Sequence, residues 1–501
     1  MTTALVNPLS SPTPPAGDFD LSVLEAGVDR ILALFRRLQD EGALPPVLSQ
    51  LTPGAVAAQL PLAAPAEGET LETILTDVER IIVPGITHWH HPSFFAYFAN
   101  SSSVPSVLGE LLMSGLNANA MLWVTSPAAT ELEQRVLQWL WTAMGLPDVD
   151  DWFGIITDTA SMSTLLAIAA AREAAGFDVR RKGMAGRSDI PVMRVYCSEH
   201  THSSIDKACI TLGLGSDNVI KIPVDAEFRM RADALDAAIR ADRAAGMHPL
   251  AVVATVGTTS TSSVDPVSAI ADICQREGVW LHVDAAYAGV MGIAPEFRWA
   301  LDGVERADSV LTNPHKWLFT TMDCSAFWTR HQDVLRNAFS LVAEYLVTGR
   351  DAQVVNYMDY GVQLGRRFRA LKLWMVIRAF GTDGLASRLR DHCAMAREFA
   401  DGVVAHPSWT LSAPVPFSLV CFRYAPSGVA DADADALNAK ILATVNTAGR
   451  VYLSHTRLHG RYVLRLAIGN ILTAREHTSL AWQELQRAAS ALQASATAGR
   501  P

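Results

Sequence analysis

Between residues 151 and 316 the sequence alternates regularly between two kinds of segment. Short runs rich in β-branched residues are separated by longer stretches with apolar residues at helical spacing. The short runs are Val192–Cys197, Ala251–Val256, Val279–Val283 and Ser309–Leu311, and the helical stretches are Ser163–Ala175, Ala232–Ala244 and Pro266–Glu277. Strands that alternate with helices are typical of a mostly parallel sheet with helices on its faces. The sequence therefore predicts an α/β fold, in which ligands bind beyond the carboxyl ends of the strands.

Polar residues gather where these strands are expected to end. Residues 157–161 open a predicted helix, where they either cap its free N–H groups or form an anion site with them. His202 lies in a polar segment directly after a strand, and is either part of a surface turn or able to stack on a flat cofactor. Asp284 ends another strand and is followed by two alanines. It either caps a helix or pairs with a buried cation.

Lys316 is the most unusual of these residues, because it lies in the apolar, proline-broken segment Leu311–Leu318. A lysine there either extends its amine to solvent or loses its proton in a desolvated site, where it can form a Schiff base. The 316 − 284 = 32 residues from Asp284 to Lys316 leave room for one helix and one strand, which would bring both side chains to one sheet edge. A lysine, an acid and a helix start are what pyridoxal phosphate requires for its aldehyde, its ring nitrogen and its phosphate.

Composition narrows the class of protein. The chain has 501 residues, enough for two or three domains, and a formal net charge of −10 without a basic run, which argues against nucleic acid or an anionic membrane as a partner. The longest apolar runs are too short to span a bilayer. Six scattered cysteines without a C-x-x-C pair argue against a zinc site or a disulfide framework and predict a cytoplasmic protein. His88 and His90 lack further ligands at metal-binding spacing, so no metal is expected.

The two ends of the chain have characters of their own. Residues 1–20 are rich in Pro, Ser and Thr and predict a disordered leader. Residues 21–85 have two helical patterns, Leu21–Glu41 and Thr70–Ile82, but little core, so this segment is expected to pack on another body or subunit. Beyond Pro407, a compact α+β domain is predicted from two strands and two helices, which are Ser418–Tyr424, Tyr462–Ile468, Asp433–Thr447 and a final helix.

Taken together, these residues resemble the group II pyridoxal-phosphate decarboxylases, most closely the aromatic L-amino-acid decarboxylases. The resemblance extends from about Leu21 to about Ala491 and rests on the motifs THWHHPSFFAYF, SPAATELE, DTAS, HTHSSIDKA, VGTTS, HVDAAYAG, NPHKW, LGRRFRALKLW and VCFR. It implies an aspartate-aminotransferase-like fold (fold type I), pyridoxal 5'-phosphate as cofactor and a homodimer with the active site at the subunit interface. It also implies a large cofactor-binding domain over residues 86–390 and a small C-terminal domain over residues 391–501.

The resemblance assigns roles around the cofactor. Lys316 would form the Schiff base with it, and Asp284 would keep its pyridine nitrogen protonated. His202 would stack on one ring face, with Ala286 beneath the other, and Thr259 would lie near the ring oxygen. The residues implied to hold the phosphate are Ala160, Ser161, Ser309, Asn313 and His315. Arg465 is expected to be structural.

On the substrate side the resemblance implies a pocket framed by aromatic residues. Its members would be Trp89, Tyr97 and Phe98 from one subunit and Asn119 and Met121 from its partner, with Leu122 also on the substrate side. These stretches contain no arginine placed to bind a distal acid, so an aromatic amino acid is expected as substrate. Gly365 matches a position where related plant enzymes carry glycine for indoles and serine for phenols. Tryptophan is therefore favoured, with tyrosine, phenylalanine, DOPA and 5-hydroxytryptophan open.

Tyr345 lies in a segment, Phe339–Tyr357, that the family uses as a mobile loop over the active site. It matches the tyrosine that returns a proton to the α-carbon, whereas phenylalanine there goes with relatives that make aldehydes. Two alternatives remain at this stage, an aromatic aldehyde synthase and a non-catalytic scaffold that binds the cofactor. The chain also departs from the family pattern at Asp158, Met162, Met121 and Leu122, which affects the expected substrate more than the cofactor.

Overall fold

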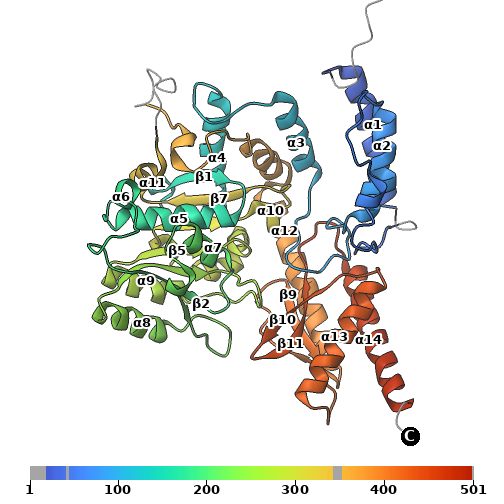
Figure 1. The fold of residues 1–501 in the computed structure, drawn as a ribbon. Coiled ribbons are helices and arrows are strands. Elements are labelled where there is room, and N and C mark those ends of the chain that lie inside the picture. The colour runs from blue at the N-terminus through green and yellow to red at the C-terminus, as the bar shows by residue number, and fades with distance from the viewer. Residues whose placement is uncertain (1–17, 41–43, 342–352, 499–501) are drawn as a thin grey trace, which may run out of the picture.

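The computed structural model describes residues 18–40, 44–341 and 353–498 (Figure 1). Most of the predicted leader therefore lies outside the described residues. Two helices follow it, α1 (Leu21–Leu38) and α2 (Leu71–Asp77), the second continued by a π-helical turn over Val78–Ile82. Figure 1 shows α1 and α2 side by side at one flank of the molecule, apart from the sheet. Arg30 and Arg37 join them through ion pairs with Glu72 and Glu79.

A seven-stranded sheet forms the centre of the large domain, in the order β1-β7-β6-β5-β4-β2-β3. Its strands are β1 (Phe153–Thr157), β2 (Met193–Ser198), β3 (Val219–Ile222), β4 (His248–Thr255), β5 (Trp280–Asp284), β6 (Ser309–Thr312) and β7 (Ser325–Thr329). Only β7 runs antiparallel to its neighbours. The mostly parallel sheet expected from the sequence is confirmed.

Helices cover both faces of this sheet. They are α4 (Pro127–Ala143), α5 (Ala160–Ala174), α6 (Val179–Lys182), α7 (Ser204–Thr211), α8 (Ala232–Ala244), α9 (Val267–Glu277) and α11 (Gln332–Phe339). Helix α3 (Val104–Leu116) packs instead on the long helix that begins at Ala370. Successive residues of a strand point to opposite faces. On β4, Val253 joins the core under α5 and α7, whereas Val252 and Ala254 join the core under α4, α8 and α9.

The connection between β5 and β6 differs from the expected single helix. It contains three 3-10 helices, Gly289–Ile293, Pro295–Leu301 and Val304–Arg306. Gly292 shows why this segment is compact, because a β-carbon there would lie 2.3 Å from the carbonyl oxygen of Met144. The prediction of an α-helix was wrong here, since close backbone packing, and not amphipathic spacing, determines the local structure.

The C-terminal part begins with α12 (Ala370–Ala405), which breaks at Gly381, where φ is 62°. A four-stranded antiparallel sheet follows in the order β10-β11-β9-β8. Its elements and the helices on it are β8 (Trp409–Leu411), β9 (Leu419–Tyr424), α13 (Asp431–Thr447), β10 (Ser454–Leu458), β11 (Arg461–Ala467) and α14 (Arg475–Ala498). The division at 390/391 stays a prediction, and it falls inside α12. Within the described ranges, none of the helices is both long and apolar enough to cross a membrane.

Candidate active site

Three of the predicted site residues meet at the carboxyl edge of the large sheet. Asp284 ends β5 and is almost fully buried, and its Oδ1 accepts a hydrogen bond of 3.0 Å from the backbone N–H of Ala286. Lys316 lies on α10 (Pro314–Trp317), directly after the neighbouring strand β6. Burial lowers the pKa of Lys316, and the charge of Asp284 opposes that shift. His202 senses both charges, since its pKa is lowered by burial, raised by Asp284 and lowered by Lys316. The predicted proximity of Lys316 and Asp284 is therefore confirmed.

The surroundings of Lys316 favour a neutral amine. Its Nζ lies 5.6 Å from the ring centroid of Phe98, and the Phe98 ring stacks on Tyr287 at 3.7 Å. Tyr287 is buried and donates to or accepts from Ser418 at 2.5 Å. The apolar surroundings lower the cost of losing a proton, which a nucleophilic amine must do, and this effect outweighs the opposing charge of Asp284.

The start of α5 provides backbone N–H groups on the same edge. Ala160 and Ser161 are the first two residues of α5, where free N–H groups and the helix dipole favour an anion. Asn313, which precedes α10, donates its backbone N–H to Ala286 at 3.2 Å. Its buried side-chain Oδ1 has no hydrogen-bond partner among the described residues. The amide group is thus available to a ligand on this edge.

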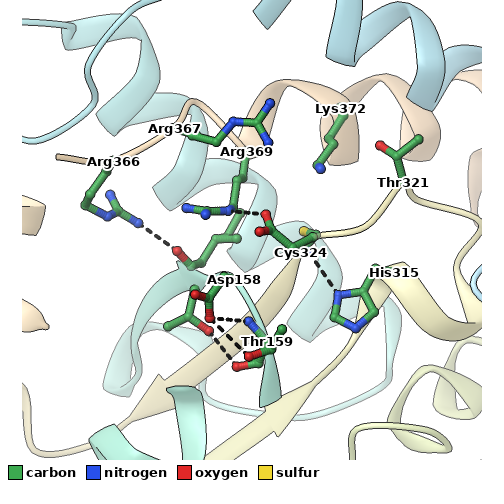
Figure 2. Close-up of polar contacts among 12 residues, drawn as sticks. Asp158, Thr159, His315, Thr321, Cys324, Arg366, Arg367, Arg369 and Lys372 are labelled. Carbon is green, nitrogen blue, oxygen red and sulfur yellow. Dashed lines mark hydrogen bonds and ion pairs between the residues drawn. The ribbon is translucent and has the colours of Figure 1, made fainter. Parts of the chain in front are cut away.

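Asp158 and His315 flank this group and are both engaged with the protein (Figure 2). Asp158 Oδ1 accepts from the backbone N–H of Thr159 at 2.5 Å and from its hydroxyl at 3.1 Å. His315 Nδ1 accepts from the backbone N–H of Cys324 at 2.9 Å, and burial lowers the pKa of His315 to about 3. His315 is therefore a neutral ring at physiological pH.

Ser309 does not lie where the resemblance placed it. It is the first residue of β6, at the end of the strand opposite to Lys316, and it is fully buried. Its Oγ accepts from Trp280 Nε1 at 2.9 Å and lies 2.9 Å from His282 Nδ1. The expected contact with the phosphate is corrected on this ground, because these two partners hold the hydroxyl in the core at the wrong end of the strand.

Thr259 and Arg465 connect the two domains. Thr259 lies exposed in the turn after β4, and its carbonyl oxygen accepts from Arg465 Nη2 at 2.6 Å. Arg465, on β11, also donates to the carbonyl oxygen of Ser260 at 3.2 Å and to Ser454 Oγ at 2.8 Å. These contacts agree with a structural arginine, and they hold the turn that carries Thr259.

Besides Phe98, the segment 85–99 contributes a cluster of aromatic rings around Trp89, called here the Trp89 wall. The Trp89 ring stacks on Tyr97 at 5.7 Å and on Phe94 at 4.5 Å. The hydroxyl of Tyr97 lies 3.2 Å from that of Tyr452, a residue that the sequence did not single out because it belongs to the C-terminal domain. Trp89 and Tyr97 remain partly exposed, as a binding surface for a flat ligand requires.

A second group of predicted substrate residues lies elsewhere. Asn119 Oδ1 accepts from the backbone N–H of Arg366 at 3.0 Å, and its Nδ2 lies 3.4 Å from Met121 Sδ. A β-carbon on Gly365 would lie 3.8 Å from Asn119 Nδ2. Leu122 is buried in a small cluster with Met358. Within the described part of the chain, no hydrogen bond or ring contact joins this group to the Trp89 wall. Tyr345 lies outside the described residues.

Comparison with known proteins identifies the family. Residues 53–425 match the model of the pyridoxal-dependent decarboxylase conserved domain. The chain belongs to this family. Tyrosine decarboxylase 2 of Arabidopsis thaliana is 43% identical over 472 residues, covering 92% of this chain and 85% of the relative. Phenylacetaldehyde synthase of the same plant is 41% identical, covering 93% and 94%. The crystal structure of Oryza sativa TDC with PLP and tryptamine has a TM-score of 0.91 at 35% identity, covering 96% of this chain and 100% of that one.

This decarboxylase is a carboxy-lyase of fold type I that uses pyridoxal 5'-phosphate. The residues at this edge of the sheet fit that cofactor. Lys316 supplies an amine with a lowered pKa, and the start of α5 supplies N–H groups. Asp284 supplies a buried carboxylate, and no ion pair among the described residues occupies it. Ala286, two residues after the end of β5, has only a methyl side chain, and its carbonyl oxygen accepts from the backbone N–H of Asn313.

Proposed function

We propose that this protein decarboxylates an aromatic L-amino acid to an arylalkylamine and carbon dioxide, with tryptophan favoured. The observation that carries the proposal is the Phe98 ring, 5.6 Å from the amine of Lys316, in the same segment as the partly exposed rings of Trp89 and Tyr97. A guanidinium does lie near, since Arg465 is 5.6 Å from the Phe98 ring, but its donors are engaged by three protein oxygens. The pocket thus favours a flat apolar side chain over one ending in an acid.

Each residue has a defined task in the reaction. Pyridoxal phosphate, when bound, supplies an aldehyde for the amino group and a π-system that accepts the electrons released as carbon dioxide leaves. Lys316 would offer a neutral amine to the aldehyde of the cofactor, and Asp284 would keep its ring nitrogen protonated. His202 would cover one ring face; its Nδ1 accepts from the backbone N–H of Ser204 at 3.1 Å, which fixes the orientation of the imidazole. Trp89 and Phe98 orient the substrate ring and exclude water.

We infer a homodimer as the active form, located in the cytoplasm. Helix α3 buries Gly109 and Met113 but exposes a row of large apolar residues, which are Val104, Val107, Leu108, Leu111, Leu112 and Leu116. An exposed apolar stripe of this length is typical of a subunit interface. In such a dimer Asn119, Met121 and Gly365, which lie apart from the Trp89 wall of their own subunit, would line the site of the partner.

Tyr345 distinguishes the decarboxylase from the aldehyde synthase. We propose that its hydroxyl returns a proton to the α-carbon. Tyr345→Phe should therefore lose amine production and, with dioxygen as oxidant and water as co-reactant, gain aldehyde, ammonia and hydrogen peroxide. The measurement is product identification by mass spectrometry from a pool of tryptophan, tyrosine, DOPA and phenylalanine, together with a peroxide assay. Aldehyde from the wild-type protein would support the synthase instead, and unchanged amine output from the variant would refute the role of Tyr345.

The same pool tests the substrate preference and the scaffold alternative. A clear preference for tyrosine would contradict the preference inferred from Gly365. Gly365→Ser is sterically tolerated, since a β-carbon there makes only ordinary contact with Asn119. Borohydride reduction followed by peptide mapping should place a pyridoxyl group on Lys316. If the purified protein has no cofactor colour and no such adduct forms, the proposed decarboxylase activity is excluded.

A further inference from the structure

A stack of four rings extends away from the amine of Lys316. Phe98, next to the amine, stacks on Tyr287 with an interplanar angle of 14°. Tyr287 stacks on Trp317 at 4.6 Å and 3°, and Trp317 stacks on His392 at 6.3 Å and 5°. His392 comes from α12 and is 4% exposed. Trp317, the neighbour of Lys316 in sequence, therefore packs against an imidazole from a helix that is distant in sequence.

The hydrogen bonds of His392 fix its tautomer. Trp317 Nε1 donates to His392 Nδ1 at 2.9 Å, and an indole N–H can only donate. Nδ1 must therefore carry the lone pair and Nε2 the proton, which goes to the backbone carbonyl of Asn470. Burial lowers the pKa of His392 to about 4, so the ring is neutral and this arrangement holds at physiological pH.

Asn470 continues the contact to the substrate wall. It is fully buried between β11 and α14, and its Oδ1 accepts from the backbone N–H of Leu472 at 2.9 Å. Its Nδ2 donates to the carbonyl oxygen of Trp89 at 3.1 Å and to that of His91 at 3.0 Å. The backbone that presents the Trp89 ring is thus fixed to the same residue that His392 contacts.

We propose that His392 is a positioning residue for the reaction. One ring nitrogen holds Trp317, the neighbour of Lys316, and the other holds Asn470, which holds the segment of Trp89. His392 thereby sets the separation between the reactive amine and the wall that binds the aromatic side chain, although it touches neither substrate nor cofactor. The inference rests on the proposed aromatic substrate and names a determinant of how tightly that substrate's ring is held.

Two substitutions separate this role from simple packing. His392→Phe keeps a ring in the stack but removes both hydrogen bonds. His392→Asn places an acceptor oxygen where Nδ1 lies and retains the bond from Trp317. We expect His392→Phe to raise KM for the best aromatic substrate about tenfold while kcat changes less than about threefold, because Lys316 and Asp284 keep their own contacts. His392→Asn should return KM to within about threefold of the wild-type value.

Asn470→Ala tests the second half of the connection. It should raise KM in the same way, and the double variant with His392→Phe should be no worse than the more affected single variant, since both interrupt one connection. Calorimetry with indole-3-propionate, which has no amino group, should show a weakening by the same factor without any turnover. His406→Phe, directly after α12, is the matched control: its ring packs edge-on against Trp482, and among the described residues its ring accepts one hydrogen bond, from the backbone N–H of Ser408 at 3.2 Å.

Cofactor absorbance and thermal denaturation establish that each variant is folded and loaded. If His392→Phe does not fold, His392→Asn and Asn470→Ala carry the test. The proposal is overturned if His392→Phe lowers stability or kcat while KM and indole-3-propionate affinity stay unchanged. It is also overturned if the increases in KM from His392→Phe and Asn470→Ala multiply in the double variant, or if His406→Phe raises KM to the same extent. A wild-type protein that forms no product from any aromatic amino acid would instead count against the proposed function.

Discussion

At the scale of single residues, the most informative departure from the family pattern is Asp158. Its carboxylate lies one residue before the N-cap of α5, where a phosphate is expected. Both oxygens are engaged, Oδ1 with Thr159 and Oδ2 with Gln363 Nε2 at 3.5 Å. Asp158 thus occupies part of the positive potential of the helix start, and it repels a second anion there.

Removing that charge should strengthen cofactor binding. Asp158→Asn keeps an oxygen that accepts from Thr159 but removes the repulsion between the carboxylate and the phosphate. At this partly solvated position that repulsion amounts to about 1 kcal/mol, or roughly fivefold in the Kd for the cofactor. The measurement is a fluorescence titration of the cofactor-free protein with pyridoxal phosphate. Glu173→Gln, at the far end of α5, is the matched control and should leave Kd unchanged. An equal or weaker affinity in Asp158→Asn would mean that the phosphate lies elsewhere.

At the scale of elements, a buried ion pair fixes α4 to the sheet. Glu133 Oε1 accepts from Arg366 Nη2 and from the backbone N–H of Ile156, each at 2.7 Å. Arg366 also donates to the carbonyl oxygen of Ile156 at 2.8 Å and lies 4.4 Å from the Tyr357 ring centroid. The pair joins α4, β1 and the segment before α12, which carries Gly365.

Breaking this pair should destabilise the protein strongly. Glu133→Ala leaves a buried guanidinium without a counter-charge, which costs about 3–5 kcal/mol in the free energy of unfolding. Glu133→Gln keeps the acceptor for Ile156 and should cost less. Urea denaturation of the cofactor-free protein measures both. The double variant with Arg366→Ala should lose less than the sum of the single losses, and simple additivity would contradict a coupled pair.

The elements also show what the sequence could and could not predict. Helix α8 has the predicted bounds, because its amphipathic spacing is local, and Asp284 and Lys316 meet as expected because parallel strands end at one edge. Strands β1 and β7 were missed, since their pairing joins segments far apart in sequence. The contribution of Tyr452 and the connection through His392 were missed for the same reason. Ser309 was misplaced because a sequence motif assigns a residue to a site but does not say at which end of the strand that residue lies.

At the scale of the whole molecule, two exposed apolar surfaces remain without a described partner surface on the same chain. One is the row of exposed apolar residues on α3. On the opposite face of this helix Gly109 packs so closely on α12 that a β-carbon would lie 2.7 Å from Lys372 Cα, so the apolar row must face outward. The other is on α1, where Leu24, Leu32 and Phe35 are each more than two-fifths exposed. Figure 1 shows α1 at the flank of the molecule, apart from the sheet, which suits a helix that packs on a second subunit.

Removal of the helical N-terminal segment should therefore disturb assembly, not only local structure. A chain that starts at Ile86 loses α1 and α2 and exposes whatever surface they cover in the partner, so we expect it to aggregate or to elute at monomer size. A chain that starts at Asp18 removes only the proline-rich leader and should keep the native size. Size-exclusion chromatography with light scattering measures both. Because Asn119 and Met121 are proposed to complete the partner's site, a monomeric 86–501 chain should also lose aromatic decarboxylation, whereas a soluble chain of native size and activity would exclude a role for α1 and α2 in the dimer.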